Sequence, residues 1–232
     1  MEEILRAGFA ELGIPVPPGA IEALRTYYEL LEERNQVTNL TAITGEEDVA
    51  RFHFLDCAAL LHYKDLSGLR VLDVGSGAGF PGLVLSILCP AVDLTLVDSQ
   101  QKRVLFQQDV VSALGLENVR CIHGRVEDLP ELRGQFDLVI SRAVAHLKIL
   151  TELCMPTLKL EGVFVSMKGP DPTEEMREAK RACHVLGGRA VRQEKYTIPG
   201  TNVTHSLIMV RKEAPSPAKY PRRYSNIKKN PL

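Results

Sequence analysis

The chain has 232 residues, of which 45% are apolar and 25% are charged, and its formal net charge is −1 at pH 7. This composition indicates one large domain, or one domain with an appendage, with enough apolar residues for a full core. No apolar run approaches the ~20 residues of a membrane helix, and five cysteines without a C-x-x-C pair argue against disulfides and zinc, so we expect a cytoplasmic protein that binds no metal.

Residues 1–65 predict a helical cap. Apolar side chains recur there at helical spacing, for example at Ile21, Leu24 and Leu31. Prolines and a polar stretch separate the helices, which we expect over residues 2–12, 20–34 and 46–63. Their apolar faces should pack against the domain that follows.

Residues 66–213 predict an α/β domain. Short apolar runs alternate with helical segments, and right-handed crossovers then make most strands parallel, with helices on both faces of the sheet. Only Pro-Gly-Thr-Asn separates the last two runs, which favours a terminal antiparallel hairpin. We expect strands over residues 70–74, 93–98, 119–123, 136–141, 162–167, 191–198 and 203–211, and helices over 81–88, 101–114, 146–158 and 172–186.

Residues 214–232 form a basic, proline-containing tail, which we expect to be extended and mobile. Residues 211–232 carry seven Lys or Arg side chains and one acid, Glu213, whereas residues 1–60 carry four basic and eleven acidic side chains. The tail therefore suits a polyanionic partner electrostatically. A solvated tail that only aids solubility explains the charge equally well.

The segment Val71–Gly82 is the most informative motif. An apolar run ends in Gly75, Gly77 and Gly79, which predicts a buried strand, a tight loop and the start of a helix. Glycine adopts positive φ and lets a ligand lie against the backbone. In doubly wound sheets, a loop at the carboxyl end of the first strand binds nucleotide-like ligands. An ordinary glycine-rich turn is the alternative.

The spacing of the glycines selects among such ligands. A dinucleotide fingerprint would need glycine at position 80, where the chain has Phe80, and there is no phosphate-binding P-loop. The pattern G-x-G-x-G after Asp73 is similar to the S-adenosylmethionine loop of Rossmann-like methyltransferases. It predicts a class I methyltransferase fold with a seven-stranded, mainly parallel sheet, a terminal antiparallel hairpin and the N-terminal helical cap.

A second acid supports this interpretation. Asp98 follows the run Leu94–Val97, 19 positions beyond Gly79, and is followed by Ser99. A carboxylate at the end of the second strand can accept hydrogen bonds from both ribose hydroxyls. Because a helical stretch follows, Asp98 could instead serve as its N-cap, and both roles can hold together.

Further motifs lie along the chain from residue 35 onward: Asn39–Ile43, His53–Asp56, Asp73–Gly82, Asp98–Ser99 with Lys102–Arg103, Arg125–Glu127, Ser141–Ala143 and Lys168–Gly169. Together they resemble the bacterial glucose-inhibited division protein B family (GidB/RsmG), which methylates guanine N7 in 16S ribosomal RNA. The resemblance implies S-adenosylmethionine as cofactor and 16S ribosomal RNA or the small ribosomal subunit as partner.

The resemblance also implies roles for single residues. Val126 and Glu127 match the pair beside the adenine, and Arg142 matches an arginine that reaches the cofactor. We expect Arg142 at the surface of a strand end, as a catalytic candidate that anchors the methionine carboxylate or an RNA phosphate. The other cofactor candidates are Asp73, Gly75, Gly77, Gly79, Phe80, Asp98 and Ser99.

Five residues are candidate RNA contacts: Asn39, His53, Lys168, Arg222 and Arg223. Each has a structural alternative, such as a turn former for Asn39 or a satisfied core histidine for His53. Basic and aromatic residues alternate in the tail, as suits RNA phosphates and unstacked bases.

The candidate residues suit methyl transfer to an acceptor atom that carries no proton. Guanine N7 has an in-plane lone pair, so in-line attack on a methyl group requires positioning and not a protein nucleophile. Cys154 follows Leu153 inside a predicted helix, unlike the nucleophile of cytosine methylation, and Ser141–Val144 lacks the Pro-Pro-Tyr of amino-group methylation. A methyltransferase for a small molecule or protein, and a ribosome-associated binding module without turnover, remain alternatives.

Overall fold

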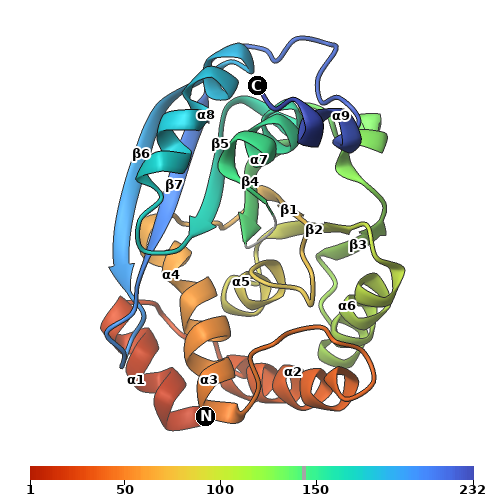
Figure 1. Ribbon diagram of the computed structural model, residues 1–232. Helices are drawn as coiled ribbons and strands as arrows, with labels where there is room; N and C mark the ends of the chain where they lie inside the picture. The colour runs from red at the N-terminus through yellow and green to blue at the C-terminus, as the bar shows by residue number, and fades with distance from the viewer. Residues whose placement is uncertain (143–144) are drawn as a thin grey trace.

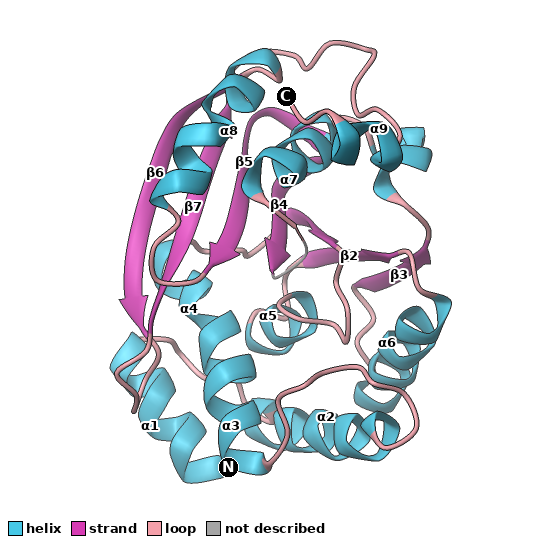
Figure 2. Ribbon diagram, viewed as in Figure 1, coloured by secondary structure: helices cyan, strands magenta, loops and turns pink. Residues whose placement is uncertain are grey.

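The computed structural model describes residues 1–142 and 145–232 and shows a seven-stranded sheet with helices on both faces (Figures 1 and 2). The strands lie in the order β3-β2-β1-β4-β5-β7-β6, and of those described only β7 runs antiparallel to its neighbours. This confirms the predicted fold class and the terminal hairpin. The strands are β1 (Arg70–Val74), β2 (Asp93–Asp98), β3 (Val119–His123), β4 (Phe136–Arg142), β5 (Leu158–Lys168), β6 (Gly188–Thr197) and β7 (Thr204–Lys212).

The helices form a layer on each face of the sheet. On one face lie α1 to α6, whose apolar side chains share one core cluster with the sheet; Phe9, Leu24 and Ile140 all belong to it. On the other face lie α7, α8 and α9. These helices are α1 (Glu2–Leu12), α2 (Ala20–Asn35), α3 (Glu46–Val49), α4 (Asp56–Tyr63), α5 (Gly82–Leu88), α6 (Gln101–Leu114), α7 (Leu147–Cys154), α8 (Thr173–Val185) and α9 (Tyr224–Lys229). Within the N-terminal cap, α2 packs against α5 and α6, and α1 packs against α2, α4 and the turn before α4, so α1 and α2 form an outer layer on this side (Figure 1).

The helix expected over residues 46–63 is not α-helical throughout. A π-helical turn, η1 (Ala50–Leu55), joins α3 to α4. Such turns often occur at functional sites because they displace side chains and carbonyls from the α-helical pattern. In this turn the carbonyl of Phe52 accepts a hydrogen bond from Arg142 at the end of β4, 3.0 Å away.

Three other boundaries differ from the prediction by three residues or more, and one of them is the start of β6, at Gly188 rather than residue 191. Helix α7 ends at Cys154 rather than residue 158, because the ring of Pro156 cannot continue an α-helix, and a 3₁₀ turn, η4 (Met155–Thr157), follows. Strand β5 begins at Leu158, four residues early, and includes Glu161 at a positive φ of 68°.

The prediction that the tail is extended and mobile is wrong. Tyr220 and Ile227 are buried, and α9 lies against α7 (Figure 1). The guanidinium of Arg133 donates to the carbonyls of Ser216 and Tyr220. The proline content of the tail favours an extended segment, and composition alone does not indicate that Tyr220 and Ile227 are buried. Within the described residues, every helix is too short or too polar to cross a bilayer.

Candidate active site

The glycine loop follows β1 and has the backbone that its sequence requires. Gly75, Gly77 and Gly79 have φ values of 72°, 60° and 100°. A Cβ on Gly77 would meet nothing closer than the Gly75 oxygen at 4.0 Å, whereas one on Gly79 would lie 2.3 Å from Leu83. Gly79 is therefore needed for packing, and Gly77 leaves open space beside the backbone for a ligand.

Two carboxylates hold this loop. Asp98 accepts from the backbone N–H groups of Gly77 at 2.9 Å and Gln100 at 2.8 Å, one at each oxygen. Asp73 is buried and accepts from Gly82 N at 2.9 Å, while its Oδ1 has no partner among the described residues. Burial raises the pKa of Asp73 well above its ordinary value. Asp98 thus braces the loop, and each of its oxygens keeps a lone pair for a further donor.

Two cavities flank the loop and share Gly75 and Ser99 in their walls. The first, of about 430 Å³, is lined by Leu40, Thr41, His53, Gly75, Ser76, Gly77, Ala78, Phe80, Asp98, Ser99, Arg103 and Arg142. The second, of about 310 Å³, is lined by Val74, Gly75, Val97, Ser99, Gln100, Gly124, Arg125, Val126, Glu127, Leu153 and Tyr224. The residues predicted to bind the methyl donor thus border one groove across the ends of β1 and β2. Asp73 and Gly79 are the exceptions, since they line neither cavity.

Arg142 lines the first cavity and is largely enclosed. Its side chain is only 14% exposed, so the expected surface position is wrong. Nη1 donates to Asp56 Oδ2 at 2.9 Å and Nη2 to His53 Nδ1 at 2.7 Å, and the guanidinium lies 5.3 Å from the centre of the Phe80 ring. The His53 ring stacks on Phe80 with centroids 4.2 Å apart. Arg142 therefore ties the π-helical turn to the glycine loop.

Asp56 is the centre of this network. Its Oδ1 accepts from the hydroxyl of Tyr196 at 2.6 Å and pairs with His205 Nδ1 at 2.8 Å, both from the terminal hairpin. Burial alone would raise the pKa of Asp56, but the hydrogen bond from His205 and the charge of Arg142 hold it below its ordinary value. The carboxylate thus stays ionised and fixes Arg142.

His53 should make the protein less stable as pH falls below about 6.5. Burial, together with the charge of Arg142, lowers its pKa from 6.5 to about 3, so the unfolded chain gains a proton that the folded protein does not. The free energy of unfolding should fall by up to ~1.4 kcal/mol per pH unit from this residue. Urea unfolding between pH 7 and pH 4.5 measures this slope, and His53→Gln should flatten it. Equal slopes in both proteins would contradict the assignment.

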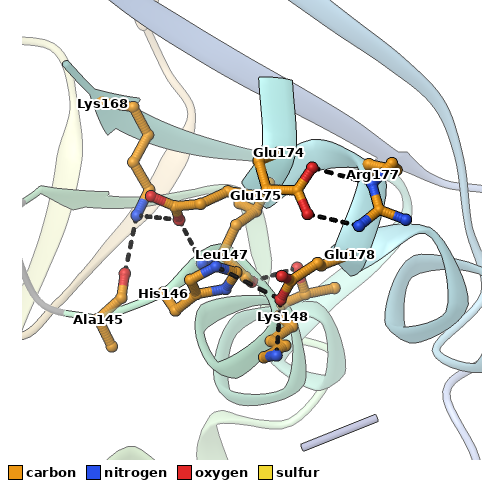
Figure 3. A network of polar contacts seen from close by, with 10 residues as sticks. Ala145, His146, Leu147, Lys148, Lys168, Glu174, Glu175, Arg177 and Glu178 are labelled. Carbon is orange, nitrogen blue, oxygen red and sulfur yellow. Dashed lines mark hydrogen bonds and ion pairs between the residues drawn. The ribbon is translucent and has the colours of Figure 1, made fainter. Parts of the chain in front are cut away.

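Lys168, a candidate RNA contact, is engaged inside the protein (Figure 3). Its Nζ donates to the carbonyl of Ala145 at 2.8 Å and pairs with Glu175 at 2.8 Å, and Glu175 also accepts from the backbone of Leu147. This network fixes the start of α7 after β4. Ala143 and Val144, which follow Arg142 in the predicted motif, lie outside the described residues.

The other four candidate RNA contacts differ in whether their side chains are exposed or engaged inside the protein. Asn39 is exposed beside Leu40, in the loop that lines the first cavity, and Arg223 is exposed at the start of α9. His53 is buried and uses both ring nitrogens, since Nε2 bonds Thr41 Oγ1 at 2.8 Å. Arg222 pairs with Glu152, a fully buried acid. Only Asn39 and Arg223 therefore have side chains free for a large ligand.

Some site residues carry no signal that sequence reasoning could use. Gln107, buried in α6, donates to Ser76 Oγ at 2.9 Å and to the Gly77 carbonyl at 2.7 Å, and so braces the loop. A polar residue in a helical stretch gives no hint of this. Among the described residues, no group of three or more His, Cys, Asp or Glu could hold a metal ion.

The groove fits S-adenosylmethionine on three observations. The open space beside Gly77 admits a ligand against the backbone, and the shared walls at Gly75 and Ser99 allow one elongated molecule to occupy both cavities. Asp98 offers acceptors beside the loop for a sugar's hydroxyls. The smaller cavity has the apolar side chains of Val126 and Leu153 for a flat ring.

Comparisons with known proteins agree with this geometry. The chain is 42% identical over 233 residues to the ribosomal RNA small subunit methyltransferase G of Alkaliphilus metalliredigens, covering 99% of this chain and 98% of that protein. It is 41% identical to the protein of the same name from Pelotomaculum thermopropionicum, covering 100% and 99%. A solved SAM-dependent methyltransferase from Aquifex aeolicus matches with a TM-score of 0.53 at 22% identity, over 71% of this chain and 93% of that one, and shows the shared fold.

The family comparison covers most of the chain. Residues 20–204 match the family described as GidB, rRNA small subunit methyltransferase G. This confirms the resemblance identified from the motifs, and with it the methyl donor. The chain belongs to the rRNA small subunit methyltransferase G family and is a methyltransferase that uses S-adenosylmethionine.

Proposed function

We propose that this protein transfers a methyl group from S-adenosylmethionine to N7 of a guanine in 16S ribosomal RNA, and that it acts in the cytoplasm, where ribosomes are. Its relatives at about 40% identity are named ribosomal RNA small subunit methyltransferase G, which supports an RNA acceptor. The choice of guanine N7 follows the family resemblance, and the chemistry of the groove supports it.

One observation supports that choice: among the described residues, the cavity that Arg142 lines offers no free base and no thiol. Of the described residues that line the first cavity, His53 has both nitrogens bonded and a pKa lowered to about 3, and the free lone pairs of Asp98 are those assigned to the donor's sugar. The carboxylate of Glu127 lines the second cavity, where the resemblance places the adenine. No cysteine lines either cavity, and burial raises the pKa of the Cys57 and Cys154 thiols. A reaction that needed a proton removed, or a covalent intermediate, would lack its catalyst here.

Guanine N7 makes no such demand. The bound donor supplies an electrophilic methyl group on a positively charged sulfur. Since N7 has a lone pair and no proton, the protein needs only to hold the acceptor in line and exclude water, and positioning alone is worth ~10⁵ M or more in effective concentration. We propose that Arg142 anchors the donor's carboxylate, because its guanidinium lines the first cavity beside the loop.

RNA should approach over the carboxyl ends of the strands. Lys102 and Arg125 are exposed there, at the start of α6 and after β3. Asn39, in the loop that lines the first cavity, and Arg223, at the start of α9, are exposed as well. These residues form the proposed RNA surface. Lys168 and Arg222 are left out of it, since their charges are neutralised within the protein.

The test is transfer of labelled methyl groups to 16S RNA and to small subunits from cells lacking this protein. Borohydride reduction followed by aniline cuts RNA at 7-methylguanosine, so we expect label in 16S RNA and one new cut. Label at another base atom, or in ribosomal proteins or small molecules, would contradict the proposal. Donor binding without any product would favour a binding module.

A further inference from the structure

We propose that the C-terminal segment 220–229 is part of the methyl-donor site, where Tyr224 forms a wall for the donor's adenine ring. The proposal rests on S-adenosylmethionine as donor and is independent of which acceptor is methylated. It gives the basic tail a role other than the RNA contact that its charge predicts.

Tyr224 lies in the second cavity together with the residues that the family resemblance assigns to the adenine. It lines that cavity with Val126, Glu127 and Leu153. Its backbone N–H donates to Glu127 Oε1 at 3.2 Å, and the guanidinium of Arg125 lies 5.4 Å from the centre of its ring. The tail is thus connected to the segment Arg125–Glu127 by both backbone and side chain.

An ion pair between the half-buried Arg222 and a buried carboxylate places Tyr224 there. Glu152 on α7 is fully buried and accepts from Arg222 at three points: backbone N at 3.1 Å, Nε at 2.8 Å and Nη2 at 2.6 Å. The next residue, Leu153, lines the cavity, and Tyr224 is two positions after Arg222. Loss of Arg222 would leave the buried charge of Glu152 uncompensated, which is costly. The pair therefore holds the tail against the cavity wall.

Apolar anchors on both sides of Arg222 add to this. Tyr220 is 7% exposed and Ile227 is fully buried, so the segment is packed before and after the cavity-lining residue. The phenol ring and the side chains of Val126 and Leu153 provide the flat and apolar surfaces on which a purine packs. Lys228 and Lys229, in contrast, are exposed on α9 and line neither cavity.

The experiment compares three variants of the full chain by calorimetric titration with S-adenosylhomocysteine and with methylthioadenosine, the nucleoside half of the donor. Tyr224→Ala should weaken the binding of both by about tenfold. Tyr224→Phe keeps the ring and should bind as the parent does. Lys228→Ala is the matched control on the same helix and should also bind as the parent does.

Each outcome separates this proposal from the proposed function, because no RNA is present. Loss of affinity in Tyr224→Ala, with recovery in Tyr224→Phe, supports the donor site even if 16S RNA is not the acceptor. Affinities within twofold of the parent in Tyr224→Ala would overturn it. So would an equal loss in Lys228→Ala, since that would reflect a general disturbance of the tail. Thermal unfolding of the free variants identifies any loss caused by misfolding. If Tyr224→Ala does not fold, Tyr224→Leu takes its place, because leucine fills the space without an aromatic face and should also lose affinity for both ligands.

Discussion

Replacing Asp56 with alanine should lower the free energy of unfolding by about 3–5 kcal/mol, the range found when one partner of a buried ion pair is removed. The change leaves the guanidinium of Arg142 without its carboxylate and removes the acceptor for Tyr196 and His205. Since Arg142 then no longer holds the π-helical turn against the glycine loop, methyl transfer should also fall. Denaturant unfolding and single-turnover transfer measure the two effects.

A double-mutant cycle isolates the pair. Arg142→Met and Asp56→Ala should each destabilise the protein, and the double variant should lose much less than the sum, because it leaves no uncompensated buried charge. Glu174→Gln, which removes a partner of Arg177 at the exposed start of α8, should leave the unfolding midpoint unchanged. Additive losses at Asp56 and Arg142 would show that the pair is not coupled as described.

The substitution Gly75→Asp should abolish measurable donor binding while the protein stays folded. Gly75 lines both cavities, so aspartate there should place a negative charge in the wall that they share, and Asp98 lines the first of them. Its φ of 72° is in the left-handed region, which aspartate tolerates better than most residues. Titration with S-adenosylhomocysteine and a thermal unfolding curve test both parts.

Gly134→Asp is the matched control. Gly134 has nearly the same φ, 66°, and a Cβ there meets nothing within 4 Å. It precedes β4, a parallel neighbour of β1, and so lies at the opposite end of the strands from the loop. It should therefore show the same small backbone strain with normal donor binding. If Gly75→Asp bound the donor as well as Gly134→Asp does, the groove could not be the donor site.

The sheet and the glycine loop could be predicted because their signals are local. Strands β1, β2 and β3 begin and end at the predicted residues, since each is a short apolar run bounded by polar residues or glycine. The loop needs positive φ at Gly75, Gly77 and Gly79, and the spacing of these glycines in the sequence indicates this. The start of β5 and the end of α7 were missed because they depend on pairing and on one proline.

The network behind the loop could not be predicted, because it joins distant parts of the chain. Tyr196 and His205 lie 140 and 149 residues from Asp56 in sequence, and only the terminal hairpin brings them together. The same reason applies to Arg142, which the strand pattern placed at the surface and the N-terminal cap encloses. The tail's position depends on Glu152, an acid in a helix that gives no sign of being buried.

The most direct test of the whole account is a crystal structure of the protein with S-adenosylmethionine. We expect the donor in the groove beside Gly75 and Ser99, with its adenine in the cavity lined by Val126 and Tyr224 and its methionine end in the cavity lined by Arg142. A donor bound in any other cavity, or no binding by the folded protein, would contradict it.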